Sequence, residues 1–147
     1  MTMTGDETAL TALFFDRPSQ VIAQNDFDRV TRKLLVFEET VRWLDTYFSG
    51  QAPDFTPPVR LEGTAFQQSV WEILRAIPYG TTRTYGQIAT QLGRMSAQAV
   101  GGAVGHNPIA LIFPCHRVIG ADGSLTGYAA GLDRKSWLLR HEHILKG

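Results

Sequence analysis

The sequence predicts an α+β fold in which a small N-terminal α/β lobe with its linker, residues 1–58, precedes a mainly helical domain, residues 59–147. Three observations support this prediction. One strand-like segment and one amphipathic helix occupy the first part of the chain. A stretch rich in Gly and Pro follows at Ser49–Pro58, which is typical of a linker. The second part contains repeated helix-capping residues.

The N-terminal lobe contains one strand signal and one helix signal. The segment ALTALFF, Ala9–Phe15, is predicted to form a short strand with a partly apolar face. A helix is predicted from about Phe37 to Phe48, with Val41, Leu44 and Phe48 on its apolar stripe.

The second domain opens with a helix whose start is marked by a capping box. Thr64 is a good N-cap, and Gln67 lies three residues further on. Pro78 and Gly80 end this helix. Its apolar residues recur at helical spacing at Phe66, Val70, Leu74 and Ile77.

Two short helices are predicted next. Thr84 and Gln87 form a second capping box for a helix from Tyr85 to about Leu92, and Ser96 caps a helix over Ala97–Gly105. Such a pair resembles a helix-turn-helix, although the pattern alone favours an ordinary helical hairpin. The second helix consists almost entirely of small residues, which indicates that another helix or a nucleic-acid backbone approaches it closely.

The remaining segments surround the motif PCHRV. Ile109–Phe113 is predicted to be a buried strand or extended segment, and Ala121–Gly131 a glycine-rich loop. An amphipathic helix begins near Asp133. Leu138 and Glu142 share one face of it, so this carboxylate points inward and needs a partner.

Composition narrows the possible functions. Net charge is zero overall, but residues 1–62 carry six basic and ten acidic side chains, and residues 63–147 carry eight and four. The second half can therefore accept a polyanionic partner. One cysteine excludes an internal disulfide, and no Cys/His cluster has the spacing of a structural zinc site. We find neither a signal peptide nor a membrane-spanning run, so a cytoplasmic protein with a free thiol is the simplest interpretation.

The only cysteine, Cys115, is followed directly by His116. A thiol reacts as the thiolate, and a neighbouring imidazole can take up its proton. Glu142 could orient that imidazole as the third member of a nucleophile–base–carboxylate arrangement. The alternative is a buried structural cysteine and a helix carboxylate with no catalytic role.

The stretch NPIALIFPCHRVIGADGSLTGYAAGLDRKSWLLRHE strongly resembles the active-site segment of the O6-alkylguanine-DNA alkyltransferases, the methylated-DNA–protein-cysteine methyltransferases. The similarity runs from Gly63 to Glu142. It implies an N-terminal α/β lobe followed by a helix-turn-helix domain, and a monomer that acts on double-stranded DNA. The implied reaction moves an alkyl group irreversibly from O6 of guanine, or less well from O4 of thymine, to cysteine after base flipping, without a cofactor.

The resemblance also assigns roles to individual residues. Cys115 matches the alkyl acceptor, His116 the water-bridged base and Glu142 the carboxylate behind it. Four positions match substrate-binding residues: Asn107 as the brace of the active-site turn, Val118 through its carbonyl, Tyr128 lining the guanine pocket and Ala129 through its amide. Four positions match DNA-binding residues, namely Thr84, Tyr85, Gln98 and Ala99.

The sequence departs from the family pattern at several positions. Gln98 replaces the usual arginine that fills the gap left by the flipped base, and Ala130 replaces a glycine at the pocket rim. The N-terminal lobe is expected to be shortened, without its opening hairpin, and to have an exposed sheet edge. Three other functions fit the sequence less well. A damage-binding module without transfer is disfavoured by Cys115, a cysteine hydrolase by the adjacent base, and a transcription regulator by the length of the chain.

Overall fold

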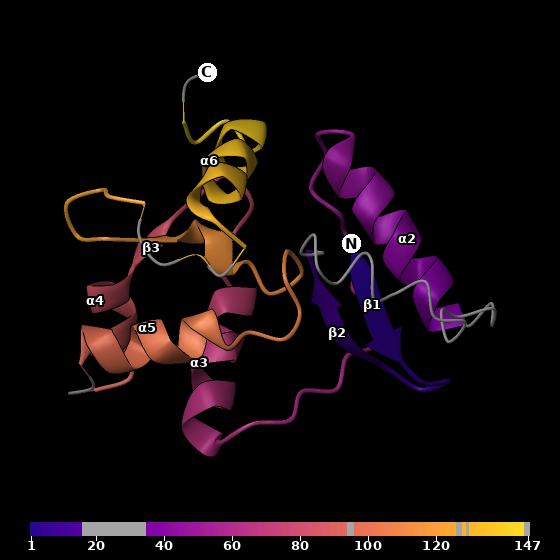
Figure 1. The fold of residues 1–147 in the computed structure, drawn as a ribbon, viewed down its shortest axis with the longest axis horizontal. Helices are drawn as coiled ribbons and strands as arrows, with labels where there is room; N and C mark the ends of the chain where they lie inside the picture. The colour runs from indigo at the N-terminus through magenta and orange to yellow at the C-terminus, as the bar shows by residue number, and fades with distance from the viewer. Residues whose placement is uncertain (16–34, 94–95, 126–127, 129, 146–147) are drawn as a thin grey trace. The chain divides into compact units, whose positions relative to one another are not determined.

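The computed structural model describes residues 1–15, 35–93, 96–125, 128 and 130–145 (Figure 1). These residues form two compact units, Met1–Arg60 and Leu61–Gly147. An α+β architecture is observed, as predicted. No helix in the described part of the chain has the length and apolarity needed to cross a bilayer.

A β-hairpin opens the first unit. Strands β1 (Thr2–Gly5) and β2 (Leu10–Phe14) pair antiparallel, with Thr2 opposite Phe14. The predicted strand is therefore confirmed, whereas the expectation that no hairpin opens the lobe is wrong. The sequence TMTG lacks the apolar alternation of a half-buried strand, and threonine side chains favour the extended backbone there instead. Thr4 and Thr11 hydrogen-bond across the two strands through their hydroxyls at 2.9 Å.

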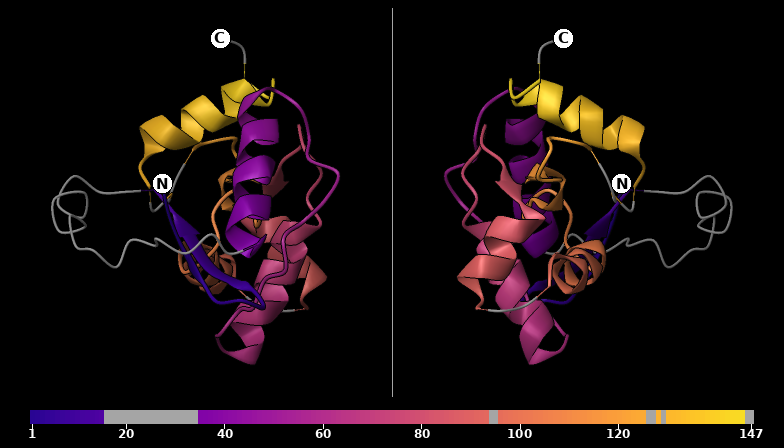
Figure 2. Two further views of the ribbon diagram at one scale, coloured as in Figure 1. Left: turned by 90° about the vertical axis from the view of Figure 1, so that its right-hand side faces the viewer. Right: turned by 90° about the vertical axis from the view of Figure 1, so that its left-hand side faces the viewer.

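Helix α2 (Leu35–Phe48) lies beside the hairpin (Figures 1 and 2). Its buried residues are Val36, Thr40, Trp43 and Tyr47. The predicted stripe is wrong by one position along the helix, because Val41 and Phe48 are 44% and 41% exposed. Both stripes are apolar, but the inner one includes the stacked rings of Trp43 and Tyr47, whose centroids lie 5.5 Å apart.

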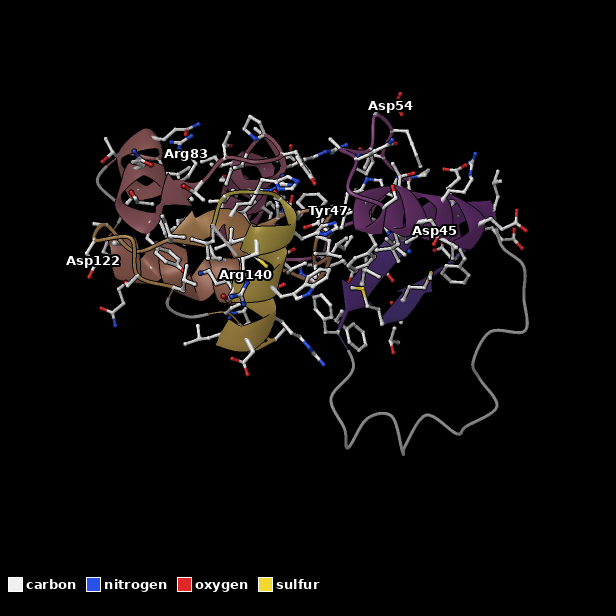
Figure 3. The ribbon with its side chains drawn as sticks, turned by 90° about the horizontal axis from the view of Figure 1, so that it is seen from above. Asp45, Tyr47, Asp54, Arg83, Asp122 and Arg140 are labelled. Atoms are coloured by element: carbon white, nitrogen blue, oxygen red, sulfur yellow. The ribbon has the colours of Figure 1, made fainter. Side chains whose placement is uncertain are left out.

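The segment predicted as a linker makes contacts within the first unit. The amide of Leu10 donates to the Pro58 carbonyl at 2.7 Å, and the amide of Arg60 donates to the Leu10 carbonyl at 2.9 Å. Residues 58–60 thus partly cover the edge of β2. Asp54 projects outward from this segment (Figure 3).

Helix α3 (Ala65–Arg75) starts the second unit, and the predicted capping box at Thr64 and Gln67 is confirmed. Its inner face carries Val70 and Leu74, as predicted, together with Trp71. The Trp71 indole donates to the Ala103 carbonyl at 2.9 Å, which attaches α3 to α5 (Ala97–Gly105).

Helices α4 (Tyr85–Gln91) and α5 pack against each other. The capping box at Thr84 and the Ser96 cap, whose hydroxyl accepts from the Ala99 amide at 3.0 Å, are confirmed. The turn between the helices includes Arg94 and Met95, which lie outside the described residues. The helix-turn-helix assignment therefore stays a prediction.

Ile109 forms an isolated bridge and a turn occupies residues 110–113, so the prediction of a strand or extended segment over Ile109–Phe113 is wrong. The apolar run is nevertheless buried. A 3-10 helix, Cys115–Arg117, follows this turn and leads into β4 (Val118–Ile119). Strand β4 pairs in parallel with β3 (Arg83–Thr84).

Helix α6 (Leu132–His141) completes the second unit. The loop before it includes Asp122, which lies at its outer side (Figure 3) and accepts a hydrogen bond from the Ser124 amide at 3.0 Å.

We predict that Trp43→Ala lowers the free energy of unfolding by about 3–5 kcal/mol, because it removes a buried aromatic side chain. Val41→Ala, on the exposed stripe of the same helix, should change it by less than about 0.5 kcal/mol. Urea unfolding followed by circular dichroism measures both. Equal losses in the two variants would contradict the assignment of the buried face.

Candidate active site

A tightly folded turn presents the only thiol of the chain. The Asn107 side chain spans this turn: its Nδ2 donates to the Phe113 carbonyl at 2.6 Å, and its Oδ1 accepts from the Ile109 amide at 3.0 Å. The Phe113 carbonyl also accepts from the Cys115 amide at 2.8 Å. One side-chain amide thus fixes the carbonyl that holds the backbone of Cys115.

Leu111 lies at the centre of this turn with φ of +69°. The Ile112 amide donates to the Ala110 carbonyl at 2.8 Å, so Leu111 is the middle residue of a γ-turn. A left-handed backbone costs an ordinary residue about 1–2 kcal/mol. Complete burial of a leucine side chain contributes about 1.5–3 kcal/mol, which is enough to hold the turn. Leu111 is 1% exposed.

The three side chains of the 3-10 helix lie in different surroundings. Cys115 is partly exposed, whereas His116 and Arg117 are buried. Burial raises the pKa of the Cys115 thiol, and Asn107 and the Lys135 ammonium act in the opposite direction. A thiol with a raised pKa needs a base to become a nucleophile.

Glu142 is buried at the end of α6 and accepts hydrogen bonds from three donors. Its Oε2 accepts from His116 Nε2 at 2.5 Å. Its Oε1 accepts from Arg117 Nε at 2.7 Å and from the Gly80 amide at 3.1 Å. The sequence required a partner for this inward carboxylate, and the structure supplies these three.

The charge state of Glu142 determines the tautomer of His116. Burial alone raises the pKa of Glu142, but the hydrogen bonds from His116 and Arg117 outweigh it and lower the pKa to about 2. An ionised carboxylate only accepts hydrogen bonds, so His116 Nε2 carries a proton. Burial lowers the pKa of His116, and the neutral ring then has its lone pair on Nδ1.

Lys135 is a site residue that the sequence analysis missed. Its side chain is fully buried, and its Nζ donates to the Val118 carbonyl at 2.6 Å. The ammonium also lies 5.9 Å from the centroid of the Tyr85 ring. Burial lowers its pKa to about 8. Helical spacing could have identified this residue. Lys135 precedes Leu138, Leu139 and Glu142 by three, four and seven positions, which places it on the same inward face of the helix.

Two tyrosines lie close enough to Cys115 for its charge to raise their pKa values. The pKa of Tyr128 is raised, first by burial and then by Cys115. Among the described residues, its buried hydroxyl has no hydrogen-bond partner. Burial and Cys115 also raise the pKa of Tyr85. Ala129 lies outside the described residues.

The residues predicted to bind DNA lie on α4 and α5. Thr84 is the N-cap of α4, and Tyr85 is its half-buried first residue. Tyr85 also packs near α5, because a Cβ added at Gly101 would lie 3.9 Å from its ring. Gln98 and Ala99 are exposed on the first turn of α5. The structure therefore connects Tyr85 to Lys135 but leaves Gln98 and Ala99 facing outward.

The described residues hold no group of three or more His, Cys, Asp or Glu side chains that could bind a metal ion. The arrangement instead suits proton transfer beside a thiol: a neutral imidazole fixed by a carboxylate, and a buried cation nearby.

Comparison with known proteins shows the family to which the chain belongs. Residues 65–144, more than half of the chain, match the model of the 6-O-methylguanine DNA methyltransferase DNA-binding domain. Residues 1–61 match the ribonuclease-like domain of the same proteins. The chain belongs to the 6-O-methylguanine DNA methyltransferase family.

Curated members of this family are similar over much of the chain. The methylated-DNA–protein-cysteine methyltransferase of Methanosarcina acetivorans is 56% identical over 107 residues, which cover 72% of this chain and 69% of the relative. That of Methanosarcina mazei is 45% identical, and the match covers 95% of this chain and 88% of the relative.

Solved structures of the family are similar along nearly the whole chain. The crystal structure of Mycobacterium tuberculosis OGT in complex with DNA superposes with a TM-score of 0.80 at 46% identity, covering 95% of this chain and 84% of that one. An O6-methylguanine DNA methyltransferase from Methanococcus jannaschii gives 0.74 at 31% identity, covering 99% and 89%.

We predict that Glu142→Gln destabilises the protein at neutral pH by about 3 kcal/mol, because Arg117 then loses its buried counter-charge. The folded pKa of Glu142 is lowered from 4.5 to about 2, so its ionised form stabilises the fold above about pH 4.5 and less as the pH falls toward 2. Urea unfolding from pH 2 to 7 should therefore show a difference between wild type and variant that shrinks in acid. A difference that stays constant over this range would contradict the assignment.

Proposed function

We propose that this protein repairs double-stranded DNA by transferring a methyl or other alkyl group from O6 of guanine to Sγ of Cys115. The observation that carries the proposal is the Cys115–His116–Glu142 arrangement around the only thiol of a chain that belongs to this family. The crystal structure of Mycobacterium tuberculosis OGT in complex with DNA supports the DNA partner.

The chemistry follows from the protonation states. His116 Nδ1 takes the thiol proton, through a bridging water, and Glu142 stabilises the resulting imidazolium through Nε2. The thiolate attacks the alkyl carbon and an S–C bond forms. The C–O6 bond breaks and its electron pair goes to guanine. The proton held by His116 then passes to the guanine leaving group, so that the imidazole is neutral again. The products are unmodified guanine and a neutral thioether.

The reaction requires no cofactor in this scheme and is not reversed, since a thioether is a poor leaving group. Each molecule therefore acts once. A thiol cannot reach the alkyl carbon of a stacked base, so the nucleotide is flipped out of the duplex. We include O4-alkylthymine as a poorer substrate of the same pocket.

The pocket is proposed to consist of groups around the thiol. Tyr128 lines it and offers its buried hydroxyl to the leaving base. The carbonyls of Cys115 and Val118 accept from the guanine amino group, and the Ala129 amide donates near O6. The Val118 carbonyl already accepts from Lys135, which leaves its second lone pair for the base. Asn107 keeps the thiol at the pocket.

Helices α4 and α5 are proposed to form the DNA-binding helix-turn-helix, with α5 in the minor groove. The exposed residues of α5 are small, which allows a close approach to the sugar-phosphate backbone. Tyr85 and Thr84 would contact the phosphate of the flipped nucleotide, while Gln98 and Ala99 lie nearest the base stack. Binding would be largely independent of sequence. We propose that the protein works as a cytoplasmic monomer.

We predict stoichiometric alkylation of Cys115. Excess duplex containing one O6-methylguanine should raise the intact mass by one CH2 per chain and never by more. Cys115→Ala and a duplex with unmodified guanine serve as controls, and neither should give a mass gain. Selective binding of the damaged duplex without any mass gain would contradict the transfer and indicate a damage sensor instead.

We also predict that Gln98→Arg strengthens binding to damaged duplex roughly threefold to tenfold at low salt, because it adds a cation at the proposed interface. Its slope of log affinity against log salt should steepen by about 0.9. Titrations in the Cys115→Ala background avoid reaction during the measurement. Gln68→Arg, which adds the same charge on exposed α3, controls for net charge. Equal affinities of Gln98→Arg and the parent protein would rule out this role of position 98.

A further inference from the structure

Arg117 is buried beside His116, although it takes no direct part in the transfer of the alkyl group. Its Nε donates to Glu142 Oε1 at 2.7 Å, and its Nη1 donates to the Ile77 carbonyl at 2.8 Å. The guanidinium also lies 5.6 Å from the centroid of the Tyr79 ring. Only 7% of the residue is exposed. Arg117 therefore has fixed geometry and does not reach out to solvent.

The two oxygens of Glu142 are divided between the base and Arg117. Oε2 accepts from His116 Nε2, whereas Oε1 accepts from Arg117 and the Gly80 amide. A guanidinium bond to one oxygen restricts rotation of the carboxylate and aims the other at the imidazole. The orientation of the His116 ring thus depends on Arg117 through Glu142.

Charge gives Arg117 a second effect. The charged groups that act on His116 are Glu142 at the end of α6, Lys135 on α6 and Arg117 on the same 3-10 helix as His116. Glu142 by itself favours a protonated imidazole. Arg117 and Lys135 oppose a further positive charge in this buried site. Because Arg117 is paired with Glu142, it also reduces the pull of that carboxylate on a proton.

We propose that Arg117 is a positioning residue for alkyl transfer: through Glu142 it holds His116 as a neutral imidazole with the proton on Nε2 and the lone pair on Nδ1. This inference rests on the proposed function, because it concerns the base of the same reaction. A buried ion pair adds little net stability compared with apolar residues of similar size, so stability alone is a weak explanation for it.

The test uses Arg117→Met, which keeps an unbranched apolar stem and removes the charged guanidinium. Single-turnover methyl transfer is measured from pH 5 to 9 with saturating damaged duplex. Without Arg117, the His116–Glu142 pair takes up a proton at higher pH. The acid limb of the pH–rate profile should therefore shift to higher pH. The rate at pH 7 should fall at least about tenfold, within the range of a lost general base. Affinity for damaged duplex, measured with Cys115→Ala, should not change.

Two further variants separate charge from bulk. Arg117→Lys keeps the cation and should return the acid limb toward its wild-type position. Arg140→Met removes an exposed arginine from the same unit and should leave the profile unchanged. A folded Arg117→Met protein whose acid limb coincides with that of wild type would overturn the proposal.

Nitrogen-15 NMR of the His116 ring supplies a readout that does not need alkyl transfer. Wild type should show the neutral Nε2–H tautomer at pH 7, and Arg117→Lys should retain it. A protonated ring, or an Nδ1–H tautomer, in wild type would overturn the proposal even if Arg117→Met did not fold. If Arg117→Met loses the tautomer that wild type shows, but wild type transfers no methyl group, the proposed function fails while the effect of Arg117 on the protonation of His116 stands.

Discussion

The buried carboxylate of Glu142 is the group on which the site depends. A charge removed from water must be compensated by close donors, and here the three donors come from two separate segments: Gly80 after α3, and His116 and Arg117 on the 3-10 helix, all facing the end of α6. Satisfying this one carboxylate therefore fixes the relative position of those segments. The same hydrogen bonds determine where the imidazole carries its proton.

The second constraint acts on the backbone before Cys115. Asn107 replaces missing main-chain partners at both ends of the turn, and the buried side chain of Leu111 offsets the cost of its left-handed backbone. A regular strand would place alternate side chains on opposite faces. The turn and 3-10 helix instead leave Cys115 partly exposed while His116 and Arg117 are buried. Nucleophile access and base burial are thus separated within three residues.

Local signals were predictable and long-range ones were not. The capping boxes at Thr64 and Thr84 were identified correctly because each is complete within four residues. The face of α2 was placed wrongly, since two neighbouring stripes are apolar and only tertiary packing chooses between them. The apolar run Ile109–Phe113 suits a strand, but the Asn107 side chain closes it into a turn.

Lys135 was missed because a lysine is buried only when distant partners such as the Val118 carbonyl are available. The site residues were named through family resemblance, because the Cys-His pair by itself favoured a structural cysteine.

The contacts of Glu142 also determine when the site can form during folding. Its bond to Gly80 joins residues 62 positions apart, and the Arg117 bonds span 25 and 40 positions. Contacts that close such long loops form late, after the local helices. A partly folded chain consequently has an exposed thiol without its oriented base. The reactivity of Cys115 that depends on His116 is therefore present only in completely folded molecules. The extent of this reaction in a sample is a measure of the folded fraction.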